Sequence, residues 1–305
     1  MTEHDRSARS GDIKSRICKH LAATFVAAMV FYASNAARAA DAPPMRIVSI
    51  NLCIDAILVE LVPQERIAAI THYSRDPYRS IIATQAQYLP ITYETAEEVV
   101  ALNPDLVLAS RHSAIVTRNA LRRVGIRYEL FDVPDTVAAS LDQIRRIATL
   151  VGREPQGELL VARIQSALEA ARRPFNQPIL SAAIYQPGGL TAGLATVTGE
   201  LMTIVGLRNV AERYDITSYQ PLPLELLISA PPQVLLVGET SAGAPMGEER
   251  IVHHRALRAL ESQMQQEIFP ARLLYCAGPT MIDALGALVA ARDDAQRALA
   301  SGKKR

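Results

Sequence analysis

Two glutamates occupy equivalent places in a pattern that the chain contains twice. The segments 96–109 and 224–237 align without a gap, and Glu97 in the first matches Glu225 in the second. In both segments apolar residues follow the glutamate at helical spacing, a proline ends the helix, and a continuous apolar run predicts a buried strand. Two α/β halves that each carry one glutamate at the start of the same helix indicate a bilobal protein with a matched carboxylate on each lobe. The alternative is a solvated glutamate that only favours the helix dipole.

A second group of side chains could bind a ligand, because we expect them in or beside the loops at the carboxyl ends of the strands. In open parallel sheets ligands bind at the carboxyl ends of the strands. The candidate ligand contacts are Asn51, His72, Tyr73, Arg75, Tyr93, Arg111 and His112 in the first half and Tyr185, Gln186, Tyr219 and Thr240 in the second. Arg75 and Arg111 present planar donors that suit a carboxylate, catecholate or hydroxamate oxygen. For each arginine a salt bridge at the rim of the site is the alternative.

An alternation of strands and helices must position these residues. The expected strands are 46–50, 67–71, 106–109 and 128–131 in the first half and 179–185, 234–237 and 273–275 in the second. The expected helices, besides those of the repeat, are 52–62, 114–124, 136–151, 156–173, 198–205 and 279–297. This alternation predicts an α/β protein with parallel sheets flanked by helices. The long helix between the two halves should limit how far they move.

Residues 1–40 are expected to be a cleavable signal peptide. A positively charged run precedes the apolar segment Leu21–Ala33, and Ala37 and Ala39 provide the small residues that a signal peptidase requires. A helix of that length rises about 20 Å, which is less than the roughly 30 Å of a hydrocarbon core, so a spanning anchor is not expected. Cleavage would leave a mature chain that starts near Ala40 or Asp41. An ordinary N-terminal helix is the alternative.

Charge and cysteine content narrow the possible partners. Residues 1–40 carry six of the 32 Lys and Arg residues and three of the 31 Asp and Glu residues, so the mature chain has a formal net charge of −2. This is not the basic surface that nucleic acid requires. Cys53 and Cys276 are the cysteines of the mature chain. They could pair in an oxidising compartment, but the sequence does not decide whether they do.

Several segments together resemble one known family. They are Arg46–Asp55 at the start of the first half, Glu97–Leu108, the connecting helix, and Val205–Ala211 in the second half. In this order they resemble the periplasmic substrate-binding proteins of ABC importers for ferric siderophores and cobalamin. The resemblance covers roughly residues 46–292 and implies two Rossmann-like lobes, each a mainly parallel sheet flanked by helices, joined by one long rigid helix. The implied boundaries are 45–152 for the N-terminal lobe, 153–176 for the connecting helix and 177–300 for the C-terminal lobe.

The resemblance also implies a function and partners. Such a protein is a periplasmic monomer that binds its ligand between the lobes and delivers it to a permease dimer, which works with an ATPase in the inner membrane. Glu97 and Glu225 would dock onto arginines of the permease. We expect a ferric siderophore or a related iron chelate, because an oxygen-rich anion suits two arginines and several tyrosines. Cobalamin is the alternative, although Ile91 and Ser110 stand where its binders have aromatic residues.

Two other classes of protein fit the sequence less well. A protein that binds free zinc or manganese needs about three histidines and a carboxylate. Of the four mature histidines, His72 and His112 follow strands, whereas His253 and His254 follow a segment that looks like a surface loop or short helix. We therefore expect no metal site formed by the protein alone and no resident cofactor. We expect no catalytic residues either, because neither a dinucleotide or Walker motif nor a serine-nucleophile motif occurs.

Overall fold

The computed structural model describes residues 42–239 and 264–301. The predicted signal peptide, Thr240 and the histidines 253 and 254 lie outside these residues. The chain from Pro44 onward forms one compact unit. Within the described residues, no helix combines the length and the apolar character that crossing a membrane requires.

The first lobe is built on a five-stranded parallel sheet. Its strands lie in the order β3-β2-β1-β4-β5. The strands are β1 (Ile47–Ser49), β2 (Ile67–Thr71), β3 (Ile91–Thr92), β4 (Leu106–Ser110) and β5 (Tyr128–Phe131). The helices are α2 (Leu52–Leu61), α3 (Ala83–Ala86), α4 (Ala96–Ala101), α5 (Ile115–Val124) and α6 (Val137–Leu150), with 3-10 turns η1 (Gln64–Arg66) and η2 (His72–Arg75). All four predicted strands of this half are confirmed, and the structure adds β3 and α3, which the sequence did not predict.

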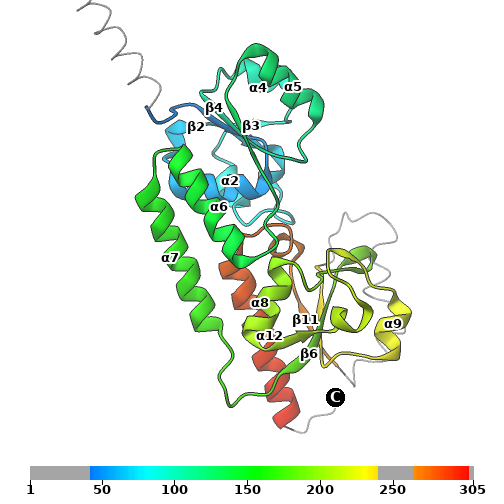
Figure 1. Cartoon of the computed structure of the whole chain (residues 1–305). Coiled ribbons are helices and arrows are strands. Elements are labelled where there is room, and N and C mark those ends of the chain that lie inside the picture. The colour runs from blue at the N-terminus through cyan, green and yellow to red at the C-terminus, as the bar shows by residue number, and fades with distance from the viewer. Residues whose placement is uncertain (1–41, 240–263, 302–305) are drawn as a thin grey trace, which may run out of the picture. The chain divides into compact units, whose positions relative to one another are not determined.

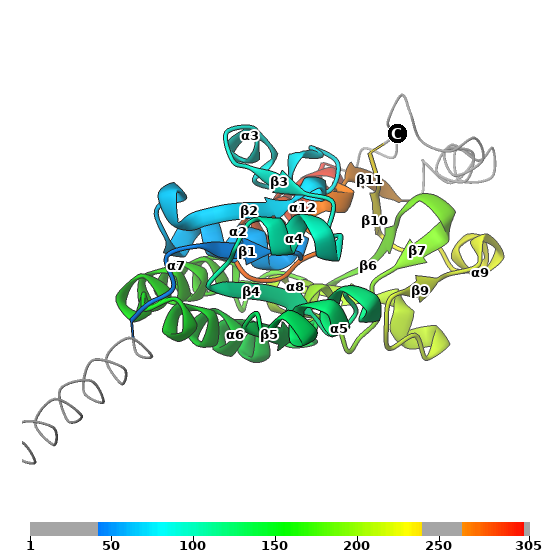
Figure 2. The ribbon, with the colours of Figure 1, turned by 90° about the horizontal axis from the view of Figure 1, so that it is seen from above.

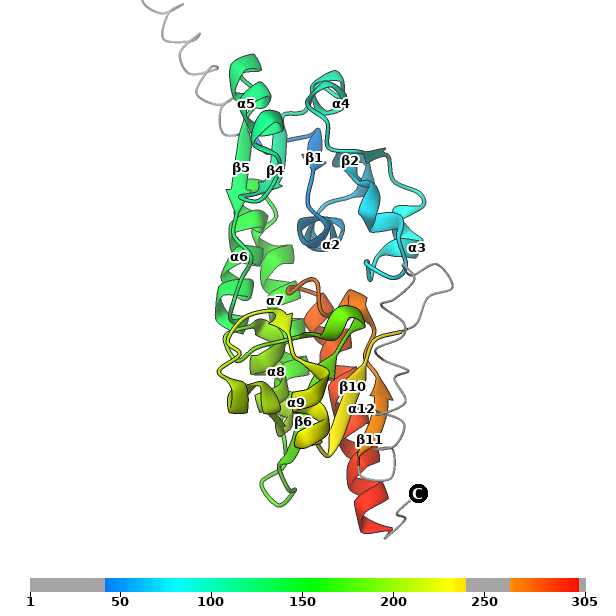
Figure 3. The same cartoon turned by 90° about the vertical axis from the view of Figure 1, so that its right-hand side faces the viewer.

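The second lobe is built on a four-stranded parallel sheet with the strand order β11-β10-β6-β8. These strands are β6 (Leu180–Tyr185), β8 (Leu207–Asn209), β10 (Val234–Val237) and β11 (Gln265–Ile268), and a small antiparallel pair joins β7 (Leu190–Thr191) to β9 (Gln220–Pro221). The helices are α8 (Val197–Val205), α9 (Leu224–Ser229) and α12 (Thr280–Ala300), with turns η3 (Pro187–Gly189), η4 (Val210–Tyr214) and η5 (Ala271–Leu273). Figure 3 shows this sheet below that of the first lobe.

The predicted strand at 273–275 is wrong. Leu273 ends the 3-10 turn η5. The edge strand beside β10 is β11, which begins eight residues before Leu273. Leu273 and Leu274 are buried in the core, which explains their apolar character. β11 lies at the edge of its sheet and is only partly buried. It therefore contains the polar residues Gln265, Gln266 and Glu267, and no run of apolar residues predicts it from the sequence.

The repeat found in the sequence is present in the fold. α4 and α9 both have six residues, and β4 and β10 begin at equivalent positions after them. Glu97 and Glu225 each lie in the first turn of their helix. The two copies therefore form the same helix–strand unit, one in each lobe.

A long helix and a shared apolar core join the two lobes. α7 (Glu154–Ala171) follows the first sheet and precedes the second, and it packs against α6, α8 and α12. Figures 1 and 2 show α6 and α7 side by side. They can approach closely because residue 157 is a glycine, where a Cβ atom would overlap that of Ala148.

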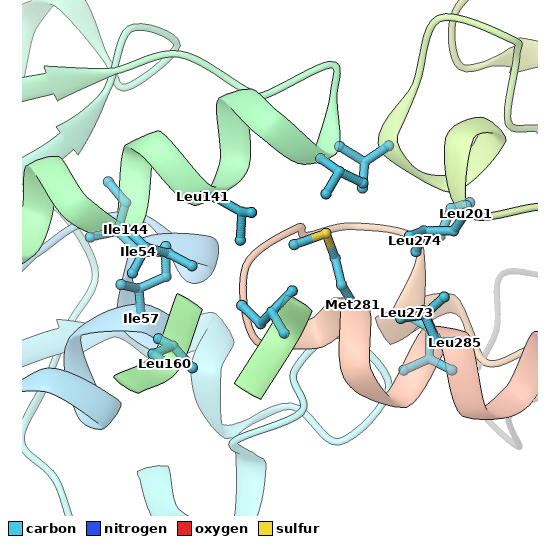
Figure 4. Close-up of a cluster of buried hydrophobic side chains, with 14 of the residues drawn as sticks. Ile54, Ile57, Leu141, Ile144, Leu160, Leu201, Leu273, Leu274, Met281 and Leu285 are labelled. Atoms are coloured by element: carbon cyan, nitrogen blue, oxygen red, sulfur yellow. The ribbon is translucent and has the colours of Figure 1, made fainter. Parts of the chain in front are cut away.

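The core under these helices is continuous from one lobe to the other. Figure 4 shows a part of it that combines Ile54, Ile57, Leu141, Ile144 and Leu160 with Leu201, Leu273, Leu274, Met281 and Leu285. Burial of such side chains contributes about 1.5–3 kcal/mol each relative to exposure. Separating the lobes at this core would expose these groups, so the core opposes large opening movements.

Polar and covalent contacts add to this connection. Val137 N in α6 donates to Glu200 Oε2 in α8 at 2.7 Å, and Gly278 N donates to Ser140 Oγ at 2.9 Å. Cys53 of α2 forms a disulfide with Cys276, which precedes α12; their Cα atoms lie 5.1 Å apart. The structure therefore settles the pairing that the sequence left open.

Asp55 is a fully buried carboxyl group in α2. Its Oδ2 accepts hydrogen bonds from Thr71 N at 3.0 Å and Ser74 Oγ at 2.6 Å. Among the described residues, its Oδ1 has no hydrogen-bond partner. Loss of water around the carboxylate outweighs these bonds and raises the pKa of Asp55 to about 8, with the charge of Glu94 acting in the same direction.

We expect Asp55→Asn to reduce the loss of folding stability at high pH. A carboxyl group whose pKa is raised by folding makes its full contribution to folding stability below pH 3.8, the pKa of the unfolded chain. It loses that contribution as the pH rises through about 8, the pKa in the folded chain. Asparagine does not titrate, so the free energy of unfolding of the variant relative to wild type should increase between about pH 5 and about pH 9. Urea titrations across this range measure it. A relative gain by the wild type would show that the ionised carboxylate is favoured.

Candidate functional site

A small pocket lies where the carboxyl ends of the first-lobe strands meet the chain that leads into α12. Its volume is about 30 Å³, enough for about one water molecule. Polar groups in its wall come from Asn51, Ser110, Asp132, Gln143 and Tyr275. Apolar groups come from Cys53, Ile54, Ile57, Phe131, Val133, Pro134 and Ala277. The wall thus combines residues from the segment after β1, from α2 and α6, and from the ends of β4 and β5 in the first lobe with a segment from the second.

Asn51 is the predicted ligand contact that lines this pocket. It is also the N-cap of α2, because its Oδ1 accepts hydrogen bonds from Cys53 N at 3.0 Å and Ile54 N at 3.1 Å. The backbone N–H groups in the first turn of a helix have no acceptor within the helix, so α2 needs this oxygen. The Nδ2 donors are the part of the side chain that can serve a ligand.

Arg111 lies next to the pocket in a salt bridge. Its Nε is 2.5 Å from Oδ1 of the pocket residue Asp132, and both side chains are more than half exposed. The pair joins the segment after β4 to the segment after β5, at the carboxyl edge of the sheet. This is the rim salt bridge that the sequence left as an alternative, and it places a cation beside the pocket.

Arg75 stabilises a loop. Its Nε donates to the carbonyl oxygen of Ala86 at 3.1 Å and its NH2 group to that of Leu89 at 2.7 Å. Both acceptors belong to the segment that follows η2, and the guanidinium is partly buried against it. Its hydrogen bonds to the backbone give Arg75 a structural role.

His72, Tyr73 and Tyr93 form an aromatic cluster after β2 and β3. The ring of His72 is 3.9 Å from that of Tyr73 and 4.6 Å from that of Tyr93, measured between centroids. The guanidinium carbon of Arg79 lies 5.2 Å from the centre of the Tyr73 ring. The structure thus brings three predicted ligand contacts together, at the same carboxyl edge of the sheet as the pocket.

The predicted contacts of the second lobe lie elsewhere. Tyr185 is 1% exposed in the core, where burial and, to a lesser extent, the nearby Glu225 raise the pKa of its phenol. Gln186 is also buried and donates to the carbonyl oxygen of Phe269 at 2.9 Å. The Tyr219 hydroxyl lies 3.1 Å from Oγ1 of Thr198. None of the three predicted contacts lines the small pocket.

Some pocket residues were not predicted from the sequence. Asp132 and Val133 follow β5 directly, so the rule that selected Arg111 after β4 could also have selected them. Tyr275 ends the predicted strand 273–275, so the rule that selected Tyr185 at the end of 179–185 could also have selected it. Gln143 lies in α6 and could not be found from strand ends.

The two matched glutamates are exposed on their helices. Beside Glu97, the neighbouring Glu98 has a structural role: its Oε2 accepts hydrogen bonds from Tyr93 N at 2.7 Å and Thr92 Oγ1 at 2.9 Å. Within the described residues, the exposed side chains of Glu97 and Glu225 make no hydrogen bond or salt bridge, although Glu225 is near enough to Tyr185 to affect its pKa. Within the same residues, no group of three or more His, Cys, Asp or Glu side chains could hold a metal ion.

The fold and the pocket define a class of bilobal proteins in which two α/β lobes share a site. The family model for periplasmic binding proteins matches residues 47–268. The chain therefore belongs to the periplasmic binding protein family, whose members are solute-binding proteins.

Known proteins of this family resemble the chain in sequence and structure. A cobalamin-binding protein from Halobacterium salinarum is 26% identical over 215 residues, which is 68% of this chain and 57% of that protein. The chain thus spans little more than half the length of the curated relatives that it matches.

Two solved structures show the same fold. The periplasmic heme-binding protein RhuT from Roseiflexus sp. RS-1, in apo form, has 26% identity and a TM-score of 0.68, covering 82% of this chain and 98% of that one. The periplasmic vitamin B12 binding protein BtuF of Vibrio cholerae has 20% identity and a TM-score of 0.63, covering 84% and 99%.

The two arginines should differ in their effect on folding stability. Arg75→Ala removes two charged hydrogen bonds to partly buried carbonyls and should lower the free energy of unfolding by about 2 kcal/mol or more. Arg111→Ala removes an exposed salt bridge and should cost less than about 1 kcal/mol. Chemical denaturation of both variants measures the difference. Equal losses would mean that the Arg111–Asp132 pair supports the fold as strongly as Arg75 does.

Proposed function

We propose that this chain is the substrate-binding protein of an ABC importer, that it works in the periplasm, and that it binds an iron chelate between its lobes. The observation that carries the proposal is the pocket whose wall is shared by strand ends of the first lobe and by Tyr275 of the second. In a fold of this family, such a position lets one ligand contact both lobes. An export signal at residues 1–40 would deliver the protein to that compartment.

The chemistry around the pocket supports an iron chelate that presents anionic oxygens, such as a ferric siderophore or heme. Arg111 offers a cation at the rim, Tyr275 an aromatic face, and Asn51 and Gln143 amide donors. The aromatic cluster on the same sheet edge extends the surface on which a large ligand could rest. The structurally similar RhuT from Roseiflexus is a heme-binding protein, which supports the same class of ligand.

Cobalamin is a second candidate because of one observation. The curated relatives, with 26% identity over 215 residues, are described as cobalamin-binding proteins. The corrin ring of cobalamin carries uncharged amide side chains at its edges, so it would depend less on the charge of Arg111 than an anionic chelate would.

The docking proposal rests on the repeat. Glu97 and Glu225 start equivalent helices in the two lobes, and both are exposed. Two carboxylates that meet two arginines of a two-fold permease would fix both the position and the orientation of the binding protein.

Ligand binding should depend on Arg111 if the ligand is an anionic chelate. A thermal-shift screen of ferrichrome, a ferric tris-catecholate, heme and cyanocobalamin identifies the ligand, since a ligand at 100 times its Kd adds about 2.7 kcal/mol of stability. Arg111→Ala should then weaken an anionic chelate by about 1.5–3 kcal/mol, because a charged donor is lost and Asp132 is left unpaired beside the anion.

Arg163→Ala is a matched control, because it removes another exposed arginine that is paired with a glutamate, Glu60, away from the pocket. It should bind like the wild type. Equal affinity of Arg111→Ala and Arg163→Ala for an anionic chelate would exclude Arg111 from the site. Binding of cyanocobalamin alone would favour the second candidate.

Transport should depend on the two glutamates, while ligand binding should not. Glu97→Lys/Glu225→Lys places like charges against the permease arginines, so uptake by cells should fall strongly and more than with either single change. Folding stability of the purified variant should change by less than about 0.5 kcal/mol per site. Glu65→Lys/Glu212→Lys, which changes one exposed glutamate in each lobe outside α4 and α9, is the control and should support normal uptake. Normal uptake with Glu97→Lys/Glu225→Lys would contradict the docking role.

A further inference from the structure

We propose that Tyr275 is the ligand contact of the second lobe and that the Cys53–Cys276 disulfide holds it at the pocket. This inference rests on the proposed function and adds to it a residue and a positioning device. The sequence pointed to Tyr185 and Tyr219 for this lobe, but neither lines the pocket. Tyr275 lines it, together with Ala277 from the same segment.

The segment that carries Tyr275 reaches across to the first lobe. Residue 278 has a φ of +64°, which favours glycine, and a Cβ atom there would come within 3.1 Å of Ile57 in α2. Its amide nitrogen donates to Ser140 Oγ in α6. α2 and α6 both belong to the first lobe, so this short segment of the second lobe packs directly on the helices beside the pocket.

Two attachments fix the backbone around Tyr275. The disulfide ties the next residue, Cys276, to the first turn of α2, where Cys53 itself lines the pocket. Two residues further on, Gly278 is held by Ser140. The side chain of Tyr275 is half exposed, so packing alone does not fix it. Its position therefore depends on the attachment of its backbone, most directly on the disulfide.

The phenol at this place suits an oxygen-rich iron chelate. Its ring offers a face on which a catecholate, a porphyrin or another planar group can stack, and its hydroxyl can donate to an anionic oxygen. Asp132 lies on the first-lobe side of the same pocket, and Arg111 beside the pocket is paired with it. A ligand between Arg111 and Tyr275 would thus contact both lobes.

A double-mutant cycle tests whether the disulfide acts through Tyr275. The variants are Tyr275→Ala, Cys53→Ser/Cys276→Ser and the combination of the three changes. Their affinities are measured by isothermal titration with whichever of ferrichrome, a ferric tris-catecholate, heme and cyanocobalamin binds the wild type. Tyr275→Ala should weaken binding about tenfold or more, and Cys53→Ser/Cys276→Ser by several-fold. The triple variant should bind within about twofold of Tyr275→Ala, because residues that act as one unit are not additive.

Tyr88→Ala is the control, since Tyr88 is 77% exposed and does not line the pocket; it should bind like the wild type. If the chain without its disulfide does not fold, Ser140→Ala removes the other attachment and should weaken binding in the wild type more than in the Tyr275→Ala background.

The outcomes separate this inference from the proposed function. A wild type that binds none of the four compounds overturns both. A wild type that binds, with Tyr275→Ala binding equally well, overturns only the role of Tyr275. Additive losses in the cycle show that the disulfide acts on the fold as a whole, and they overturn the positioning role.

Discussion

The structure depends on the apolar core that the two lobes share. The buried faces of α2, α6, α7, α8 and α12 meet in one cluster that both lobes contribute to, and each lobe has in addition a smaller cluster of its own. This differs from a pair of domains on a flexible linker, whose relative position is set by the ligand. Here the fold itself limits the distance between the strand ends of the first lobe and Tyr275. Because the pocket between them holds about one water molecule, a large ligand would extend over the exposed side chains around it.

Several strand-end residues serve the fold rather than a ligand. The oxygen of Asn51 caps α2, Arg75 holds the carbonyls of a loop, and Gln186 joins the ends of two strands. The carboxyl edge of a parallel sheet must satisfy its own backbone before it can bind anything. The side chains that are left for recognition are the exposed ones, chiefly Arg111 with Asp132, Tyr275 and the aromatic cluster.

The sequence predicted the parts of this fold that depend on local pattern. The repeat predicted equivalent helices and strands in both lobes, since a proline stop and an apolar run act within a few residues. β11 was missed because an edge strand carries little apolar signal. The burial of Tyr185 was missed because a position at the end of a strand does not tell which face of the strand is covered. The disulfide and the placement of Tyr275 depend on residues 223 positions apart, which local pattern cannot bring together.

The most direct test of the account is a crystal structure of the chain with the chelate that stabilises it, with data collected at the iron absorption edge. The account predicts an anomalous peak for iron between the lobes, with the ligand in contact with Arg111 or Asp132 on one side and Tyr275 on the other. An iron peak on the outer surface of one lobe, or a pocket that stays free of ligand at saturating concentration, would contradict it.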